Sequence, residues 1–325
     1  MTAAISDATP AVAPRRGPRF RRLVAYQAER FSLAGYAPLI VAFTFSSAAY
    51  SRLARRAAGM PGAYGFVPWR LYAVGALTSL TFFFALRVLD EHKDAETDRR
   101  FRPELPVPRG LVSLAELRAV GAGAVALAVA LNAVVAPVLL LPFGLVTVWA
   151  TLMTKEFFVR EWLRAHLGAY LVTHMLIMPM IDVYTTGLDW LVAGYGPPAG
   201  LPYFLGVTFA NGCLVEIGRK LRLPERERDG VDSYTREWGL RVAPLAWIAI
   251  LLASATLAWR AAFWTGAAPE TALVVFPAAA LAAIPAVRFL ARRDPLGRVV
   301  EVTSGIWGIV TYLTLGAGPF LARLI

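Results

Sequence analysis

Apolar residues fall in nine long blocks along the chain, separated by shorter segments rich in arginine and acidic residues. Each block is about 17–25 residues long, the length that a helix needs to cross roughly 30 Å of hydrocarbon. Unpaired backbone groups are too costly in lipid, and the short alternating strands of an outer-membrane barrel are absent, so the blocks indicate helices. The pattern predicts an all-α, polytopic membrane protein with about nine transmembrane helices in one bundle, at residues 32–52, 69–89, 114–135, 137–154, 164–184, 200–219, 240–261, 270–290 and 302–323.

Composition and length favour one membrane domain. Of the 325 residues, 57% are hydrophobic and only 17% are charged, far from the balance of a soluble domain. Residues 1–31 have no signal-peptide core and are expected to form a basic, partly disordered cytoplasmic N-terminus. No Gly/Ser linker divides the rest, so residues 32–325 are predicted to be a single transmembrane domain. The single cysteine, Cys213, excludes an internal disulfide.

Basic residues alternate sharply between the two sides of the predicted bundle. With the N-terminus inside, 27 of the 33 lysines and arginines lie on the cytoplasmic side. The positive-inside rule therefore predicts an N-in, C-out, multi-pass protein of the inner (plasma) membrane with its polar loops facing the cytoplasm. The net charge of +11 is an orientation signal. A nucleic-acid partner is not expected, because the basic residues are dispersed among membrane loops.

The first candidate site follows the second predicted span. Asp90, Asp94 and Asp98 recur every four residues, so on a continuing helix all three carboxylates share one face. Such a row repels itself unless a hard cation binds it, and Mg²⁺ is typically held by one or two carboxylates, waters and substrate phosphate oxygens. The alternative is a solvated helix end whose aspartates are neutralised by nearby cations such as Lys93.

The second candidate site begins inside the sixth span. Glu216 lies in the last turns of an apolar helix, where an ionisable residue is costly unless it faces a cavity or a partner. The alternative is an ion pair with Arg219 or Lys220, three and four residues further on. Both acidic segments lie on the same predicted side of the membrane. A bundle can therefore place them as two carboxylate walls around a metal-bridged phosphate.

A third element follows the fourth span. The chain has three lysines, and Lys93, Lys155 and Lys220 fall in three different cytoplasmic segments. If this distribution is not chance, Lys155 is the best candidate for a direct contact to a diphosphate. Other intramembrane polar residues are expected to be internal hydrogen-bond partners, namely Asn132, His174 and Asp182.

Together these motifs resemble the UbiA family of intramembrane prenyltransferases, and the resemblance covers nearly the whole chain. The family's first motif, N-D-x-x-D-x-x-x-D followed by R-P, is matched by Asp90, Asp94, Asp98, Arg102 and Pro103. The stretch 216–220 is similar to the E-I-x-K of archaeal-lipid-type members, and 229–233 to the end of the second acidic motif. The chain departs from the pattern at Leu89, where the family has Asn, and at 225–229, where aspartates normally dominate.

The resemblance implies a fold, an activity and a set of site residues. It implies an enzyme that transfers a polyprenyl group from a polyprenyl diphosphate donor to a lipophilic or aromatic acceptor, with Mg²⁺ as cofactor. The implied metal ligands are Asp90, Asp94, Asp98, Glu216, Glu225 and Asp229. The implied diphosphate contacts are Arg30, Arg102, Lys155, Arg219 and Lys220, of which Lys155 is also implied to be catalytic together with the first three aspartates.

Other functions remain open at this point. The same fold could cyclise the prenyl chain on its own double bonds, and a non-catalytic member could keep lipid binding without transfer. An ion-coupled transporter is a further alternative, but it predicts charged residues near mid-membrane, whereas these cluster at one face. Pocket shape decides the acceptor and the prenyl chain length, so both stay open.

Overall fold

The computed structural model describes residues 17–227, 232–291 and 297–323. Within these ranges all regular structure is helical, and nine segments are long and apolar enough to cross a membrane. They are Leu33–Ala57, Trp69–Lys93, Leu114–Val135, Pro137–Thr154, Leu167–Gly187, Leu201–Arg219, Tyr234–Phe263, Ala268–Leu290 and Arg298–Ala322. The all-α class and the nine predicted spans are confirmed, with ends that differ by a few residues. The N-in, C-out orientation stays a prediction.

The helices are numbered in chain order. Their bounds are α1 Arg19–Arg30, α2 Leu33–Ala57, α3 Trp69–Lys93, α4 Ala95–Phe101, α5 Leu114–Val135, α6 Leu140–Thr154, α7 Arg160–Ala165, α8 Leu167–Met175, α9 Ile177–Gly187, α10 Leu201–Arg219, α11 Tyr234–Phe263, α12 Ala268–Leu290, α13 Gly297–Tyr312 and α14 Gly318–Ala322. Four single turns complete the described structure, at Pro137–Leu139, Glu156–Phe158, Pro224–Arg226 and, as a π-helix, Leu313–Ala317.

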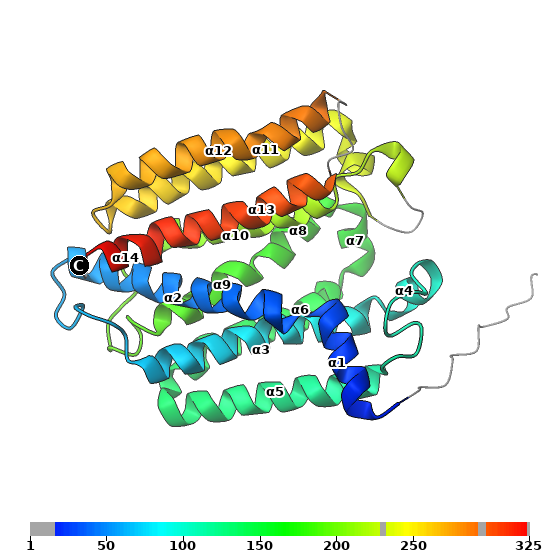
Figure 1. Ribbon diagram of the computed structural model, residues 1–325, viewed down its shortest axis with the longest axis horizontal. Coiled ribbons are helices and arrows are strands. Elements are labelled where there is room, and N and C mark those ends of the chain that lie inside the picture. Colours follow the sequence, from blue (N-terminus) through cyan, green and yellow to red (C-terminus); the bar gives the residue numbers. More distant parts are fainter. Residues whose placement is uncertain (1–16, 228–231, 292–296, 324–325) are drawn as a thin grey trace, which may run out of the picture.

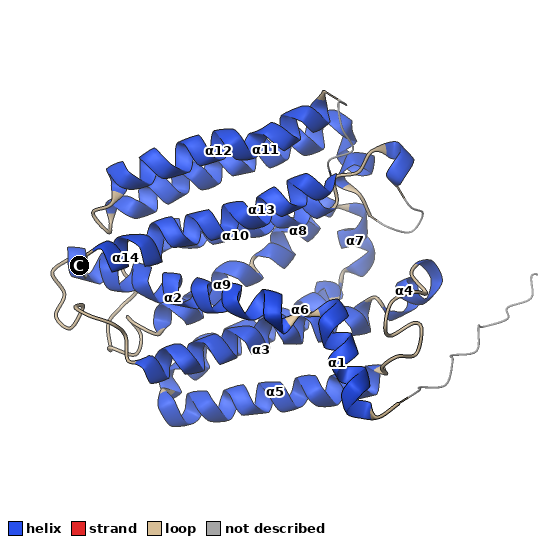
Figure 2. Cartoon of the chain, in the orientation of Figure 1, coloured by secondary structure: helices blue, strands red, loops and turns tan. Residues whose placement is uncertain are grey.

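The long helices run side by side as a bundle (Figure 1). Helices α11 and α12 form one edge, α3 and α5 form the other, and α10, α13, α2 and α9 lie between them. The short helices α1, α4 and α7 gather at one end of the bundle, and the C-terminal helix α14 lies at the opposite end. Figure 2 shows that the longer loops lie at the two ends, as expected when irregular backbone is kept out of lipid, and that a one-residue break at Leu176 separates α8 from α9 within the fifth span.

Helix α1 was not predicted, because residues 1–31 were expected only to form a basic, partly disordered N-terminus. It lies across the ends of α3 and α5 (Figure 1). Its buried residue Tyr26 packs with Val88 of α3 and Leu117 of α5. Arg22 is held by Glu116 of α5, with Nη2 and Oε1 2.7 Å apart. Apolar packing and an ion pair therefore fix α1 to the bundle.

Two glycines shape the helices around the core. Gly239 has φ +86° inside α11, a left-handed conformation that glycine adopts easily. It separates the polar first turn from the apolar part of the helix, where the hydrophobic pattern places the start of the seventh span at residue 240. Gly316 lies in the π-turn before α14, and a Cβ there would overlap the backbone of Ser46 in α2. The close approach of α2 and the ninth span therefore depends on glycine.

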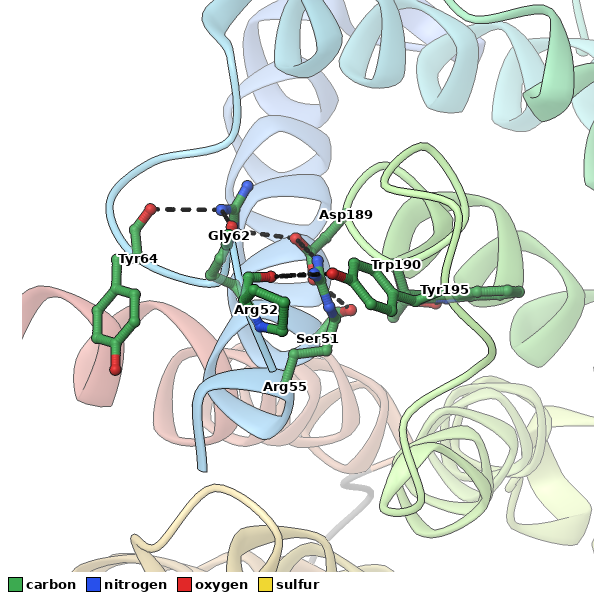
Figure 3. Close-up of polar contacts among 10 residues, drawn as sticks. Ser51, Arg52, Arg55, Gly62, Tyr64, Asp189, Trp190 and Tyr195 are labelled. Atoms are coloured by element: carbon green, nitrogen blue, oxygen red, sulfur yellow. Dashed lines mark hydrogen bonds and ion pairs between the residues drawn. The ribbon is translucent and has the colours of Figure 1, made fainter. Parts of the chain in front are cut away.

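A buried ion cluster lies near the C-terminal end of α2, which is the end opposite α1 (Figure 1), and Figure 3 shows it in close-up. Asp189, just after α9, accepts a hydrogen bond from Arg55 at 2.8 Å and another from Ser51 at 2.8 Å. The Nε of Arg52 lies 2.9 Å from the same carboxylate. The two arginines also donate to backbone carbonyls at positions 61 and 62. Both arginines are buried inside α2, which continues past the predicted end of the first span at residue 52.

Candidate functional site

A polar cavity of about 1280 Å³ lies at the end of the bundle where α4 and α7 are found. Its walls come from α1, α3, α4, α7, α8, α10, α13, the first turn of α11, the end of α12 and the segment between α10 and α11. Eleven basic and nine acidic described residues line it. The two acidic segments that the sequence singled out therefore meet around one cavity, as predicted.

The first wall carries the three aspartates of the repeat. Asp90, Asp94 and Asp98 all line the cavity. The predicted single helix is wrong in one detail, because α3 ends at Lys93 and α4 begins at Ala95. Backbone bonds still run from the Asp94 N–H to the Asp90 carbonyl at 2.9 Å and from the Asp98 N–H to the Asp94 carbonyl at 2.8 Å. The carboxylates therefore stay on successive turns despite the break.

Asp98 is the buried member of this row. Its carboxylate lies 3.4 Å from Nη1 of Arg102, which also lines the cavity. Burial raises the pKa of Asp98, because a charged carboxylate loses hydration there, and the positive charge of Arg102 partly opposes this effect. By contrast, Asp90 is exposed to the cavity. The row thus offers both open and partly shielded carboxylates.

Glu216 is held by two cations rather than facing the cavity. Arg219 Nη2 lies 2.6 Å from one carboxylate oxygen and Lys220 Nζ lies 2.9 Å from the other. These are the ion pairs that the spacing offered as the alternative to a metal ligand. Glu216 is buried and is absent from the lining, whereas Arg219 and Lys220 both line the cavity. In this structure Glu216 orients the two cations.

The second wall is formed by the segment after α10. Glu225 is exposed and lines the cavity. Glu227 also lines it and pairs with Arg236 at 2.9 Å. The remaining implied ligand, Asp229, lies outside the described residues. Among residues that are described on this wall, Asp232 completes the acidic lining.

Lys155 is not brought to the cavity. It is exposed at the end of α6 and does not line the cavity, although Glu156 and Arg164 from the same segment do. The chain turns sharply here, with φ of +47° to +61° at the three residues 156–158. Such values are uncommon for residues other than glycine. This turn directs Glu156 inward, where it pairs with Arg160 at 3.1 Å.

Tyr170 joins the two walls and was missed by the sequence analysis. Lys93 of the first wall donates a hydrogen bond to the Tyr170 hydroxyl at 3.0 Å. Lys220 of the second wall lies over the same ring, 5.2 Å from its centroid, a distance typical of cation–π contact. Two of the three lysines therefore meet at one aromatic ring of α8. No local spacing could reveal this contact, because Lys93 and Tyr170 are 77 residues apart.

Arg30 reaches the cavity from α1. Its Nε donates to Glu91 of α3 at 2.7 Å, and the residue lines the cavity. Burial lowers the pKa of Arg30, but the hydrogen bond and the charge of Glu91 outweigh it, so the pKa is raised and the guanidinium stays charged. Arg30, Arg102, Arg219 and Lys220 thus share one cavity, while Lys155 lies apart.

The intramembrane polar residues are hydrogen-bonded inside the bundle, as predicted. Asp182 accepts from Ser47 at 2.8 Å and from Tyr312 at 2.6 Å. Asn132 donates to Thr78 at 2.8 Å. His174 lies within hydrogen-bonding distance of a backbone carbonyl through Nδ1.

The cavity presents carboxylate oxygens, the ligand type that Mg²⁺ prefers. Among the described residues, no group of three or more His, Cys, Asp or Glu side chains is placed to hold a metal ion together. Mg²⁺ usually needs only one or two carboxylates and takes its other ligands from water and substrate phosphates. The carboxylates of Asp90, which is exposed, and Asp94, which is half-buried, fit this mode, because both line the cavity with hard oxygen donors.

Comparisons with known proteins identify the fold. No family model and no curated protein matches the sequence. A solved structure of a digeranylgeranylglyceryl phosphate synthase in membranes superimposes with a TM-score of 0.61 over 93% of this chain and 99% of that one, at 11% identity. A UbiA homolog from Aeropyrum pernix K1 superimposes with a TM-score of 0.60 over 88% of this chain and 98% of that one, at 14% identity. The resemblance to the UbiA family is therefore confirmed at the level of the fold.

Proposed function

We propose that the protein is an intramembrane prenyltransferase that moves a polyprenyl group from a polyprenyl diphosphate to a lipophilic or aromatic acceptor. The observation that carries the proposal is the cavity of about 1280 Å³, where two acidic segments and a set of cations meet at one end of a membrane bundle. The shared fold with a UbiA homolog and a digeranylgeranylglyceryl phosphate synthase supports the same activity class.

The cations suit the donor's diphosphate. Arg30, Arg102, Arg219 and Lys220 line the cavity together. Guanidinium groups bind phosphate oxygens in pairs, and an ammonium group binds them as a point charge. Apolar residues Leu167 and Phe289 also line the cavity. The donor would thus have cations for its head and an apolar surface where its tail begins.

The carboxylates suit Mg²⁺. Asp90 and Asp94 would be its principal ligands, and Asp98 and Glu225 line the same cavity. Bound there with the diphosphate, the ion would neutralise charge that builds on the leaving group. The protein's own cations would also stabilise the leaving diphosphate while the allylic C–O bond breaks, because they are fixed near the developing anion. The acceptor then attacks the allylic carbon.

One observation favours a non-catalytic lipid-binding alternative. Glu216 is engaged by two cations, and Lys155 lies outside the cavity. Both residues are implied to be part of the site by the resemblance. Measurements of donor binding and transfer separate the two functions, because a lipid-binding member would bind the donor and transfer nothing.

The first test is equilibrium binding of radiolabelled geranylgeranyl diphosphate to the purified protein, with and without Mg²⁺. We expect Mg²⁺-dependent binding that Asp94→Asn abolishes, since this residue lines the cavity with a carboxylate. Glu96→Gln is the matched control, because Glu96 lies on the adjoining helix α4, is exposed and does not line the cavity. Equal binding by Asp94→Asn and the control would overturn the metal site, and no binding by the wild-type protein would overturn the function.

A further inference from the structure

Glu91 is a buried carboxylate that the proposed chemistry does not use. It follows Asp90 directly, but consecutive helical residues point about 100° apart, and Glu91 faces α1 instead of the cavity. Only 2% of its surface is exposed. Its Oε1 accepts a hydrogen bond from Arg30 Nε at 2.7 Å and a longer one from the Tyr26 hydroxyl at 3.4 Å.

The pair leaves the outer part of the Arg30 guanidinium available. Glu91 uses only Nε, and neither Nη group of Arg30 makes a hydrogen bond or ion pair with another described residue. Arg30 lines the polar cavity. Two free Nη groups on a fixed planar fork suit paired hydrogen bonds to phosphate oxygens.

Glu91 is not required simply to dock α1. The first half of this helix is held by Arg22 and Glu116, and Glu29 pairs with Arg109 at 2.6 Å. Neither pair involves a residue that lines the cavity. A buried carboxylate beside an anion site also opposes anion binding by simple repulsion. Glu91 offsets this repulsion by fixing the direction of the Arg30 guanidinium.

We propose that Glu91 is a positioning residue that holds Arg30 against the donor's diphosphate and so sets the affinity of the cavity for that group. The inference rests on the proposed function and extends it to a residue outside the metal and phosphate contacts. Because Arg30 contacts the diphosphate group, loss of this contact should weaken the binding of inorganic diphosphate as much as that of the prenylated donor.

The test is a double-mutant cycle between Glu91 and Arg30, measured on the full chain. Dissociation constants for geranylgeranyl diphosphate and for inorganic diphosphate are determined with Mg²⁺ for the wild type, Glu91→Gln, Arg30→Gln and the double variant. We expect each single variant to raise Kd about tenfold, the loss of one charge-assisted hydrogen bond. The double variant should be no worse than Arg30→Gln, because both changes remove the same contact.

Glu116→Gln is the matched control. It breaks a different ion pair of α1, at a residue that does not line the cavity, so we expect Kd to change less than twofold. An equal loss in this control would mean that a loosened α1, and not the placement of Arg30, weakens binding, and it would overturn the proposal. If Glu91→Gln fails to fold, Arg30→Lys tests the same point, because it keeps the charge but loses the planar fork. We expect its Kd to rise about tenfold with an unchanged melting temperature.

The outcomes separate this inference from the proposed function. Wild-type binding with an unchanged Kd in Glu91→Gln, or losses that add in the double variant, would overturn the inference alone. A wild-type protein that binds neither ligand would overturn the function and the inference with it.

Discussion

Replacing Asp189 by Asn should strongly destabilise the fold without changing ligand binding in the cavity. The carboxylate is 2% exposed and is shared by Arg55, which is fully buried, and by Arg52. Asparagine keeps the size of the side chain and a hydrogen bond to Ser51, but it removes the only negative charge in the cluster that Figure 3 draws. Two cations then remain buried with backbone carbonyls as their main partners.

The expected cost follows from the charges. Removing one partner of a buried ion pair costs about 3–5 kcal/mol, and the carbonyls at positions 61 and 62 keep the loss near the lower limit. For a chain of 325 residues, roughly 2 °C of melting temperature is lost per kcal/mol. We therefore expect a fall of about 6 °C. Arg52→Gln should cost less, because it leaves Asp189 and Arg55 as a neutral pair.

The assay can use the protein's single thiol. Cys213 is buried, so a thiol-reactive fluorogenic dye reports unfolding in detergent as this residue becomes exposed. Arg56→Gln is the control, since Arg56 is the exposed next residue on the same helix. Binding of geranylgeranyl diphosphate at low temperature should be unchanged, because the cluster lies at the end opposite the cavity. A melting temperature within 2 °C of the wild type, or a larger loss in Arg52→Gln, would refute the charge argument.

Two further predictions concern the cavity wall and the packing of the core. Burial raises the pKa of Asp98 above its ordinary value of 3.8, so the folded state holds that proton more tightly than the unfolded state, and stability falls as pH rises through the window above 3.8. Asp98→Asn should therefore leave the melting temperature at pH 7 equal or higher while weakening Mg²⁺-dependent donor binding; a lower melting temperature would mean that the ion pair with Arg102 outweighs the cost of burial. Gly316→Ala should lower the melting temperature by several degrees, because its Cβ would overlap the backbone of Ser46 and the two helices would have to separate. Gly308→Ala, in the same span with open space at its Cβ, should change little, and equal behaviour of the two variants would contradict this account.

The sequence alone determined the membrane architecture. Nine apolar blocks of spanning length leave few alternatives to nine helices, because lipid offers no partner for an exposed backbone. Local spacing also predicted the shared face of Asp90, Asp94 and Asp98. It offered ion pairs with Arg219 and Lys220 as the alternative to a metal-binding role for Glu216. These relations lie within four residues of one another, where helix geometry alone fixes which side chains are neighbours.

Contacts between distant segments were decided by the tertiary structure. Arg30 and Glu91 are 61 residues apart, and Arg55 and Asp189 are 134 apart. No periodicity links such positions, so the sequence could not distinguish Glu91 from a solvated acid. The position of Lys155 outside the cavity was missed for a related reason, because an irregular turn at 156–158 with three left-handed residues, and not helix geometry, decides which residues after α6 face the cavity.

One physical cause separates the features that the sequence determined from those that the tertiary structure decided. Burial of apolar surface and backbone hydrogen bonding act on each segment separately, so the residues of that segment determine whether and where it spans the membrane. The cavity depends on which ends of α1, α3, α8 and α10 pack together, and this is a property of the whole bundle. The sequence could therefore name most of the charged residues that line the cavity, while only the packed helices decided which of them face it and which hold the others in place.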